Sequence, residues 1–130
     1  MALHPAAMVV RAGAIRDVLT LRRKVEKAIE DGLGACLSVF ADVDRTDDEE
    51  AGMTLYHLCT VSEIPHNQVQ LSTVARLVEQ GFELELDTSA DQARTHHNVT
   101  LGEPVAESEL LKFIQCFGGP VPNPNPKKPR

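Results

Sequence analysis

Residues 82–87 alternate strictly between apolar and acidic side chains. A phenylalanine and two leucines occupy one set of alternate positions, and three carboxylates, Glu83, Glu85 and Asp87, occupy the other. Because successive side chains of a strand point to opposite faces, this pattern predicts a strand with one buried and one acidic face. After a polar turn, residues 97, 99 and 101 alternate with the more polar residues 96, 98 and 100, so we expect the two segments to form an antiparallel hairpin.

Other segments carry apolar residues at helical spacing. The first, residues 14–31, is followed by Gly32, which supplies a left-handed stop. A short apolar run over residues 36–43 then predicts a buried strand. The remaining predicted helices begin after Asp47 or Asp48, run from Ser72 to Gly81, and run from near Pro104 to Gly118.

The length and element order together indicate one α+β domain. The chain has 130 residues, 42% of them hydrophobic, which suits a single globular core. The order of helices and strands predicts a two-layer domain, in which a small mixed or antiparallel sheet of about three strands packs against about four helices. We assign residues 1–117 to this domain. Residues 118–130 hold five of the eight prolines and several basic groups, and are predicted to form a disordered basic tail.

The cysteines and the N-terminal residues predict a cytoplasmic protein. Cys36, Cys59 and Cys116 have neither the CxxC spacing of metal sites nor the even number of a disulfide framework. The first residues lack the basic start of a signal peptide, and no apolar run approaches the roughly 20 residues that span a bilayer. We therefore expect no membrane association.

Charge is distributed unevenly along the chain. The net charge is −6, but residues 42–109 alone hold three basic and fifteen acidic groups, a charge of −12. Such a segment repels phosphate backbones, so nucleic acid is an unfavourable partner. A protein with a basic or neutral surface is the expected partner.

Residues 37–46 end an apolar segment with two aspartates, Asp42 and Asp44, followed by a threonine. The segment resembles the first motif of haloacid-dehalogenase-type phosphatases. That resemblance implies a magnesium-dependent phosphatase in which Asp42 is the nucleophile and Asp44 the general acid. The family also uses a downstream lysine and a later acidic pair, whereas Lys112 is the only lysine between Lys27 and the tail.

The order of elements over residues 55–101, helices followed by a hairpin, resembles that of a winged-helix DNA-binding domain. A winged-helix-like transcriptional regulator is therefore an alternative function. Its recognition helix would offer only Arg76 and its wing only Arg94, among several carboxylates, whereas phosphate contacts need clustered basic groups.

The five histidines do not form a recognisable metal site. His96 and His97 are adjacent on a predicted strand, so their side chains point to opposite faces. We place His97 on the apolar face and His96 on the acidic face, where Glu83, Glu85 or Asp87 across the hairpin would favour the charged imidazole. The acids after Asp42 also fail as a calcium loop, since Asp47 stands where a glycine is needed.

No complete set of catalytic residues is recognised, so we expect no catalytic residue, metal or cofactor. The sequence instead predicts a small acidic, non-catalytic protein-interaction or regulatory module of the antitoxin, immunity or accessory type. An exposed sheet edge would also allow a homodimer. The predicted partner-binding residues are acidic, with one histidine beside them: Glu83, Glu85, Asp87, His96, Asp47, Asp48, Glu49 and Glu50.

Overall fold

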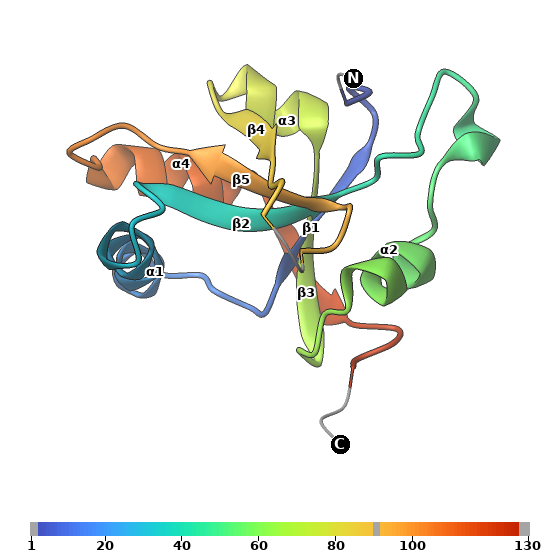
Figure 1. Ribbon diagram of the computed structural model, residues 1–130, viewed down its shortest axis with the longest axis horizontal. Helices are drawn as coiled ribbons and strands as arrows, with labels where there is room; N and C mark the ends of the chain where they lie inside the picture. The colour runs from blue at the N-terminus through green and yellow to red at the C-terminus, as the bar shows by residue number, and fades with distance from the viewer. Residues whose placement is uncertain (1–2, 90–91, 128–130) are drawn as a thin grey trace.

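The computed structural model describes residues 3–89 and 92–127 and places its strands in one antiparallel sheet (Figure 1). Within these residues the sheet has six strands in the order β4-β5-β2-β1-β3-β6. The strands are β1 (Met8–Ala12), β2 (Cys36–Ala41), β3 (Gln68–Thr73), β4 (Glu83–Leu86), β5 (His96–Thr100) and β6 (Gly118–Pro122). The helices are α1 (Val18–Glu30), α2 (Leu55–Ser62), α3 (Val74–Glu79) and α4 (Glu107–Gln115), with a 3-10 turn, η1, at Glu49–Ala51.

The α+β class is confirmed, but the predicted sheet of about three strands is wrong. The hairpin of β4 and β5 and the buried strand β2 were predicted, whereas β1, β3 and β6 were not. The missed strands carry weak or mixed local signals: β1 holds an arginine, β3 alternates over residues 68–72 but runs directly into α3, and β6 contains glycines and prolines. Pairing with neighbours in the sheet decides the conformation of such segments more than local propensity does.

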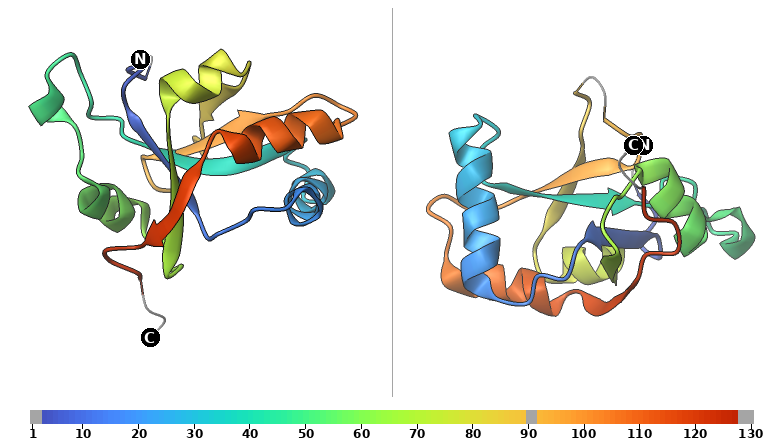
Figure 2. Two further views of the ribbon diagram at one scale, coloured as in Figure 1. Left: turned by 180° about the vertical axis from the view of Figure 1, so that it is seen from behind. Right: turned by 90° about the horizontal axis from the view of Figure 1, so that it is seen from below.

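The helices cover the two faces of the sheet unequally (Figure 2). One core, on the side of α1, α3 and α4, includes Leu21, Leu77 and Phe113. A second, smaller core on the other side packs α2 and the segment after it against β1 and β3, through residues such as Leu58 and Ile64. Helix α2 contacts β2, but no described helix covers Ser38, which is exposed in the middle of this interior strand.

Side-chain caps set the helix starts, and several differ from prediction. Asp17 accepts a hydrogen bond from the Thr20 amide at 2.8 Å and begins α1. The predicted second helix divides in two, since Asp48 caps only η1 while Thr54 caps α2. Thr73, not Ser72, caps α3.

Residues 118–122, assigned to the tail by the sequence, instead form β6 and pair with β3. Prolines are tolerated there because β6 is an edge strand. A proline nitrogen that faces solvent removes no hydrogen bond between strands. Asn123 then donates from Nδ2 to the carbonyls of Ile64 and His66, at 3.1 and 2.8 Å. Residues 128–130 lie outside the described part of the chain. None of the described helices has the length and apolar character needed to cross a membrane.

Candidate functional site

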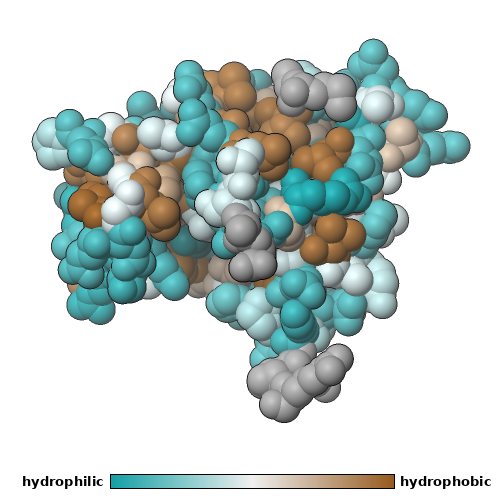
Figure 3. Space-filling model, in the orientation of Figure 1, coloured by the Kyte–Doolittle hydropathy of each residue, from teal (hydrophilic) through white to brown (hydrophobic). Residues whose placement is uncertain are grey.

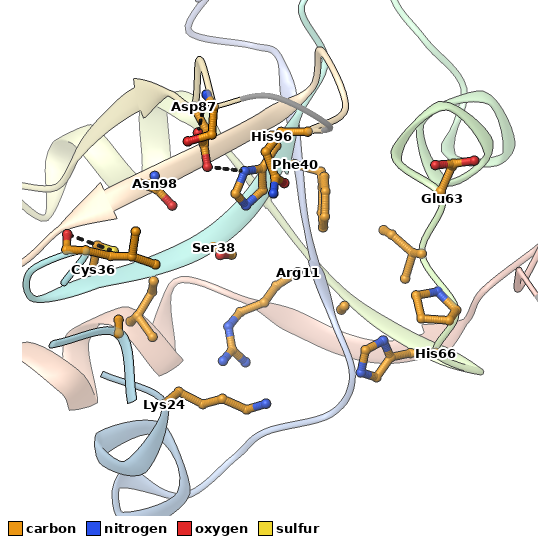
Figure 4. Close-up of a pocket in the computed structure, with 18 of the residues that line it drawn as sticks. Arg11, Lys24, Cys36, Ser38, Phe40, Glu63, His66, Asp87, His96 and Asn98 are labelled. Carbon is orange, nitrogen blue, oxygen red and sulfur yellow. Dashed lines mark hydrogen bonds and ion pairs between the residues drawn. The ribbon is translucent and has the colours of Figure 1, made fainter. Parts of the chain in front are cut away.

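A pocket of about 480 Å³ opens on the face of the sheet that carries the smaller core, where the helices leave Ser38 exposed. Strands β2 and β5 form its floor, α1 and the segment 63–66 its walls, and the turn after β4 its rim (Figure 4). In the space-filling view the face is hollowed between α1 and the middle of the molecule, with hydrophilic and hydrophobic residues side by side (Figure 3). We call this the Arg11 pocket, after the buried cation that lines it.

Arg11 enters the pocket because β1 and β2 separate. The two strands pair only at Val9 with Ala41 and at Val10 with Phe40, and diverge beyond that point. The Arg11 side chain occupies the space between them.

The Arg11 guanidinium has no protein counter-ion among the described residues. Arg11 is only 7% exposed, its Nε is buried without a hydrogen-bond partner, and no described carboxylate lies within ion-pair distance. Burial lowers the pKa of Arg11 to about 10, so the group is still charged at neutral pH. Buried charges in proteins are normally paired, and an arginine buried in this way is equipped to receive an anion.

Lys24 adds a second cation to the same pocket. It projects from α1, and its ammonium group points toward the space that Arg11 enters (Figure 4). No ion pair involves Lys24 within residues 3–89 and 92–127, whereas Lys27, one turn further on, pairs with Asp31 at 3.0 Å. Two neighbouring cations without an acid between them produce a locally positive potential.

The backbone of Ser38 faces the gap between β1 and β2. The Asp42 amide donates to the Met8 carbonyl, so Asp42 directs its backbone toward β1. Backbone groups of every second strand residue point to the same side, and hence those of Phe40 and Ser38 also face β1. Because the pairing of β1 with β2 ends at Phe40, the Ser38 amide is free of the ladder and is a further donor beside Arg11.

Asp87 and His96, two of the predicted partner-binding residues, also line the Arg11 pocket. Asp87 Oδ2 lies 2.9 Å from His96 Nδ1, and Asp87 Oδ1 accepts from the Ser89 amide at 2.9 Å. The hydrogen bonds from Ser89, more than the contact with His96, hold the pKa of Asp87 below its usual value. The angle at His96 Nδ1 does not satisfy a hydrogen bond, so the contact is an ion-pair distance only.

The other predicted partner-binding residues lie outside the pocket. Glu83 and Glu85 are exposed on the edge strand β4, while the remaining four belong to the exposed loop around η1. Within that loop Asp47 lies 2.8 Å from the His4 imidazole, and Asp48 caps η1. The structure therefore divides the predicted acidic residues among three places.

Asp42 and Asp44 each have protein partners. Asp42 is buried, and its carboxylate accepts from the backbone amides of Asp44, Arg45 and Met53, at 2.9, 3.1 and 2.8 Å. Asp44 forms two hydrogen bonds with the Arg94 guanidinium, at 3.0 and 3.2 Å, which hold the pKa of Asp44 below its ordinary value. These contacts give both aspartates a structural role in fixing the loop after β2.

His97 and the three cysteines, side chains that could serve as metal ligands or nucleophiles, are buried. Among the described residues, no three His, Cys, Asp or Glu side chains come together as a metal site. His97 packs inside, where its Nδ1 lies 2.8 Å from the Thr95 carbonyl and burial lowers its pKa. Burial also raises the pKa of each cysteine thiol, which disfavours the reactive thiolate.

Comparison with protein-family models, with curated proteins and with solved structures finds no significant match. Neither Arg11 nor Lys24 was among the site residues predicted from the sequence. The available signal was one arginine inside the apolar segment Met8–Ala12, since a charge within a strand of a sheet interior needs a partner.

Proposed function

We propose that this protein is a non-catalytic binding module, which holds in the Arg11 pocket a small ligand carrying a carboxylate or phosphate group. The observation that supports this most directly is the buried Arg11 guanidinium without a described counter-ion. A bound anion would supply the missing charge and accept its hydrogen bonds.

The rest of the pocket supports the same function. Lys24 contributes a second positive charge, and the backbone amide of Ser38 contributes a donor at the gap. Guanidinium groups bind carboxylate and phosphate through paired, charge-assisted hydrogen bonds. The pocket volume, about 480 Å³, lies within the range of small-molecule sites.

Titration with inorganic phosphate and with acetate, followed by amide chemical shifts in NMR spectra, tests the proposal. We expect saturable shifts at Arg11, Lys24 and Ser38. Arg11→Met removes these shifts, and Lys24→Gln weakens binding about tenfold, since each variant loses a charge-assisted contact.

Lys27→Gln is the matched control, because Lys27 lies on the same helix but pairs with Asp31 outside the pocket. It should bind both anions as the unmodified protein does. Absence of saturable shifts, or equal shifts in the Arg11→Met variant, would refute the proposed function.

A second candidate function is capture of a basic protein partner at the edge strand β4. Its outer edge is unpaired by the described strands, and it carries the exposed Glu83 and Glu85. Beside it, Val78 and Leu86 are 57% and 53% exposed and line a groove of about 400 Å³ between α3 and β4. An extended segment with alternating basic and apolar residues would pair with such an edge by β-strand addition.

A synthetic peptide of alternating lysine and valine tests this second function by calorimetry. We expect binding that weakens with salt and is reduced in the Glu83→Gln/Glu85→Gln variant. The Glu49→Gln/Glu50→Gln variant removes the same charge from η1 and should bind normally. Equal loss in both variants would mean nonspecific attraction and would contradict docking at β4.

A further inference from the structure

We infer that the ligand of the Arg11 pocket is a small zwitterion, whose anionic group binds Arg11 and Lys24 and whose amine binds the carboxylate of Asp87. This inference rests on the proposed anion site and adds the chemistry of the ligand's other end. It would assign the pocket to molecules of the amino-carboxylate class.

The pocket has opposite charges at its two sides. Figure 4 shows Arg11 and Lys24 on one side of the β2–β5 floor and Asp87 on the other, with Ser38 and Asn98 between them. A ligand with only an anionic group would contact Arg11 and Lys24 and would leave Asp87 without a ligand partner. A zwitterion places its negative group beside the two cations and its positive group beside Asp87, so that its charges are complementary to those of the pocket.

Asp87 retains capacity for a further donor. A carboxylate offers about four acceptor sites. The Ser89 amide and the Ser89 side chain use two of them, and the His96 ring faces a third, which leaves one for a ligand donor. The His96 contact lacks hydrogen-bond alignment, so a ligand ammonium does not have to break a well-formed bond. The second acidic side chain of the pocket, Glu63, already pairs with Lys127 at 2.9 Å and is the less available of the two.

The sheet sets the separation that the ligand must cover. Arg11 stands on β1, Ser38 on β2, Asn98 on β5 and Asp87 at the end of β4, four neighbouring strands of the sheet. Two regular spacings, from β4 to β2, amount to about 10 Å between backbones. The gap between β2 and β1 at Arg11 is wider than a regular spacing and adds to this distance, while the side chains reduce it. The amine and the anionic group should therefore be separated by several bonds, and not share one carbon atom.

A series of ω-amino carboxylates, each compared with its amine-free counterpart, tests the inference. The pairs are β-alanine and propionate, γ-aminobutyrate and butyrate, δ-aminovalerate and valerate, and ε-aminocaproate and caproate. Dissociation constants come from NMR titration of the full chain. We expect the amine to increase affinity by about fivefold in the longer pairs and not in the shortest.

Variants locate each end of the ligand. Asp87→Asn should remove the gain from the amine, while plain carboxylates should bind at least as tightly as before, because the variant removes a negative charge from the pocket. Glu63→Gln, the matched control, should preserve the gain. Arg11→Met should weaken both members of every pair.

The outcomes separate the two proposals. If plain carboxylates bind through Arg11 but the amine adds nothing at any length, the zwitterion inference is wrong and the anion site stands. If no carboxylate binds, both fail. If the amine increases affinity equally in Asp87→Asn, the amine does not bind at Asp87 and the inference is overturned.

Discussion

The guanidinium carbon of Arg11 lies 5.6 Å from the centroid of the Phe113 ring. Phe113 projects from α4 in the core below the sheet, so the aromatic face supports the guanidinium from one side while the pocket opens on the other. A cation–π contact of this kind partly offsets the cost of burying the charge. It does not replace an anion, because the ring accepts no conventional hydrogen bond from Nε.

Arg11→Met is expected to stabilise the ligand-free protein by about 1 kcal/mol, since methionine fills the space without a buried charge. The same variant should show no further stabilisation by phosphate, whereas phosphate should raise the melting temperature of the unmodified protein. Thermal unfolding with and without phosphate measures both effects. A clear loss of stability in the ligand-free variant would show that Arg11 has a structural role that the contacts do not reveal.

Local sequence patterns predicted the strands β2, β4 and β5, whereas the strands that were not predicted depend on pairing between segments far apart in the sequence. The β4–β5 hairpin was predictable because its alternation is strict and its turn is polar. β1 is held between β2 and β3, and β6 pairs with residues of β3 that are 47 to 54 positions away in the chain, so the partners that fix both strands lie outside their own sequence. Three missed strands changed the predicted small sheet into one of six.

The candidate site was predictable only in part, for a related reason. Asp87 and His96 face each other because they are neighbours across a predicted hairpin. Arg11 and Lys24 meet them only through the pairing of β1 and the packing of α1, which no short-range pattern encodes. The acidic composition predicted a site built of carboxylates, whereas the buried charge without a counter-ion among the described residues is an arginine.

Asp42→Asn is expected to destabilise the protein by about 1–3 kcal/mol, because an amide nitrogen would face the Met53 N–H in place of an accepting oxygen. Asp44→Asn is the matched control. Its exposed pair with Arg94 should contribute less than about 1 kcal/mol. Urea unfolding measures both variants, and equal effects would contradict the role of Asp42 as the anchor of the loop.

Asn123→Ala should lower the free energy of unfolding by about 1–3 kcal/mol, since it leaves the carbonyls of Ile64 and His66 without the donor that joins them. Asn125→Ala removes a more exposed bond to Thr60 and should cost less. Because Ile64 and His66 form a wall of the Arg11 pocket, the Asn123 variant should also weaken phosphate binding. Unchanged stability in Asn123→Ala would show that the segment after β6 is not anchored there.

Folding stability should fall as the pH is lowered through the ordinary imidazole range, because His97 is buried as the neutral ring. Burial lowers its pKa from the ordinary value of 6.5, so between the folded and unfolded values the unfolded chain binds more protons. Stability is then complete above pH 6.5 and decreases below it. Urea unfolding from about pH 8 to about pH 5.5, in the unmodified protein and in His97→Gln, measures this dependence. The difference between the two proteins should diminish as the pH falls, since only the unmodified chain has this imidazole to protonate, and a constant difference across the range would mean that His97 is not the group responsible.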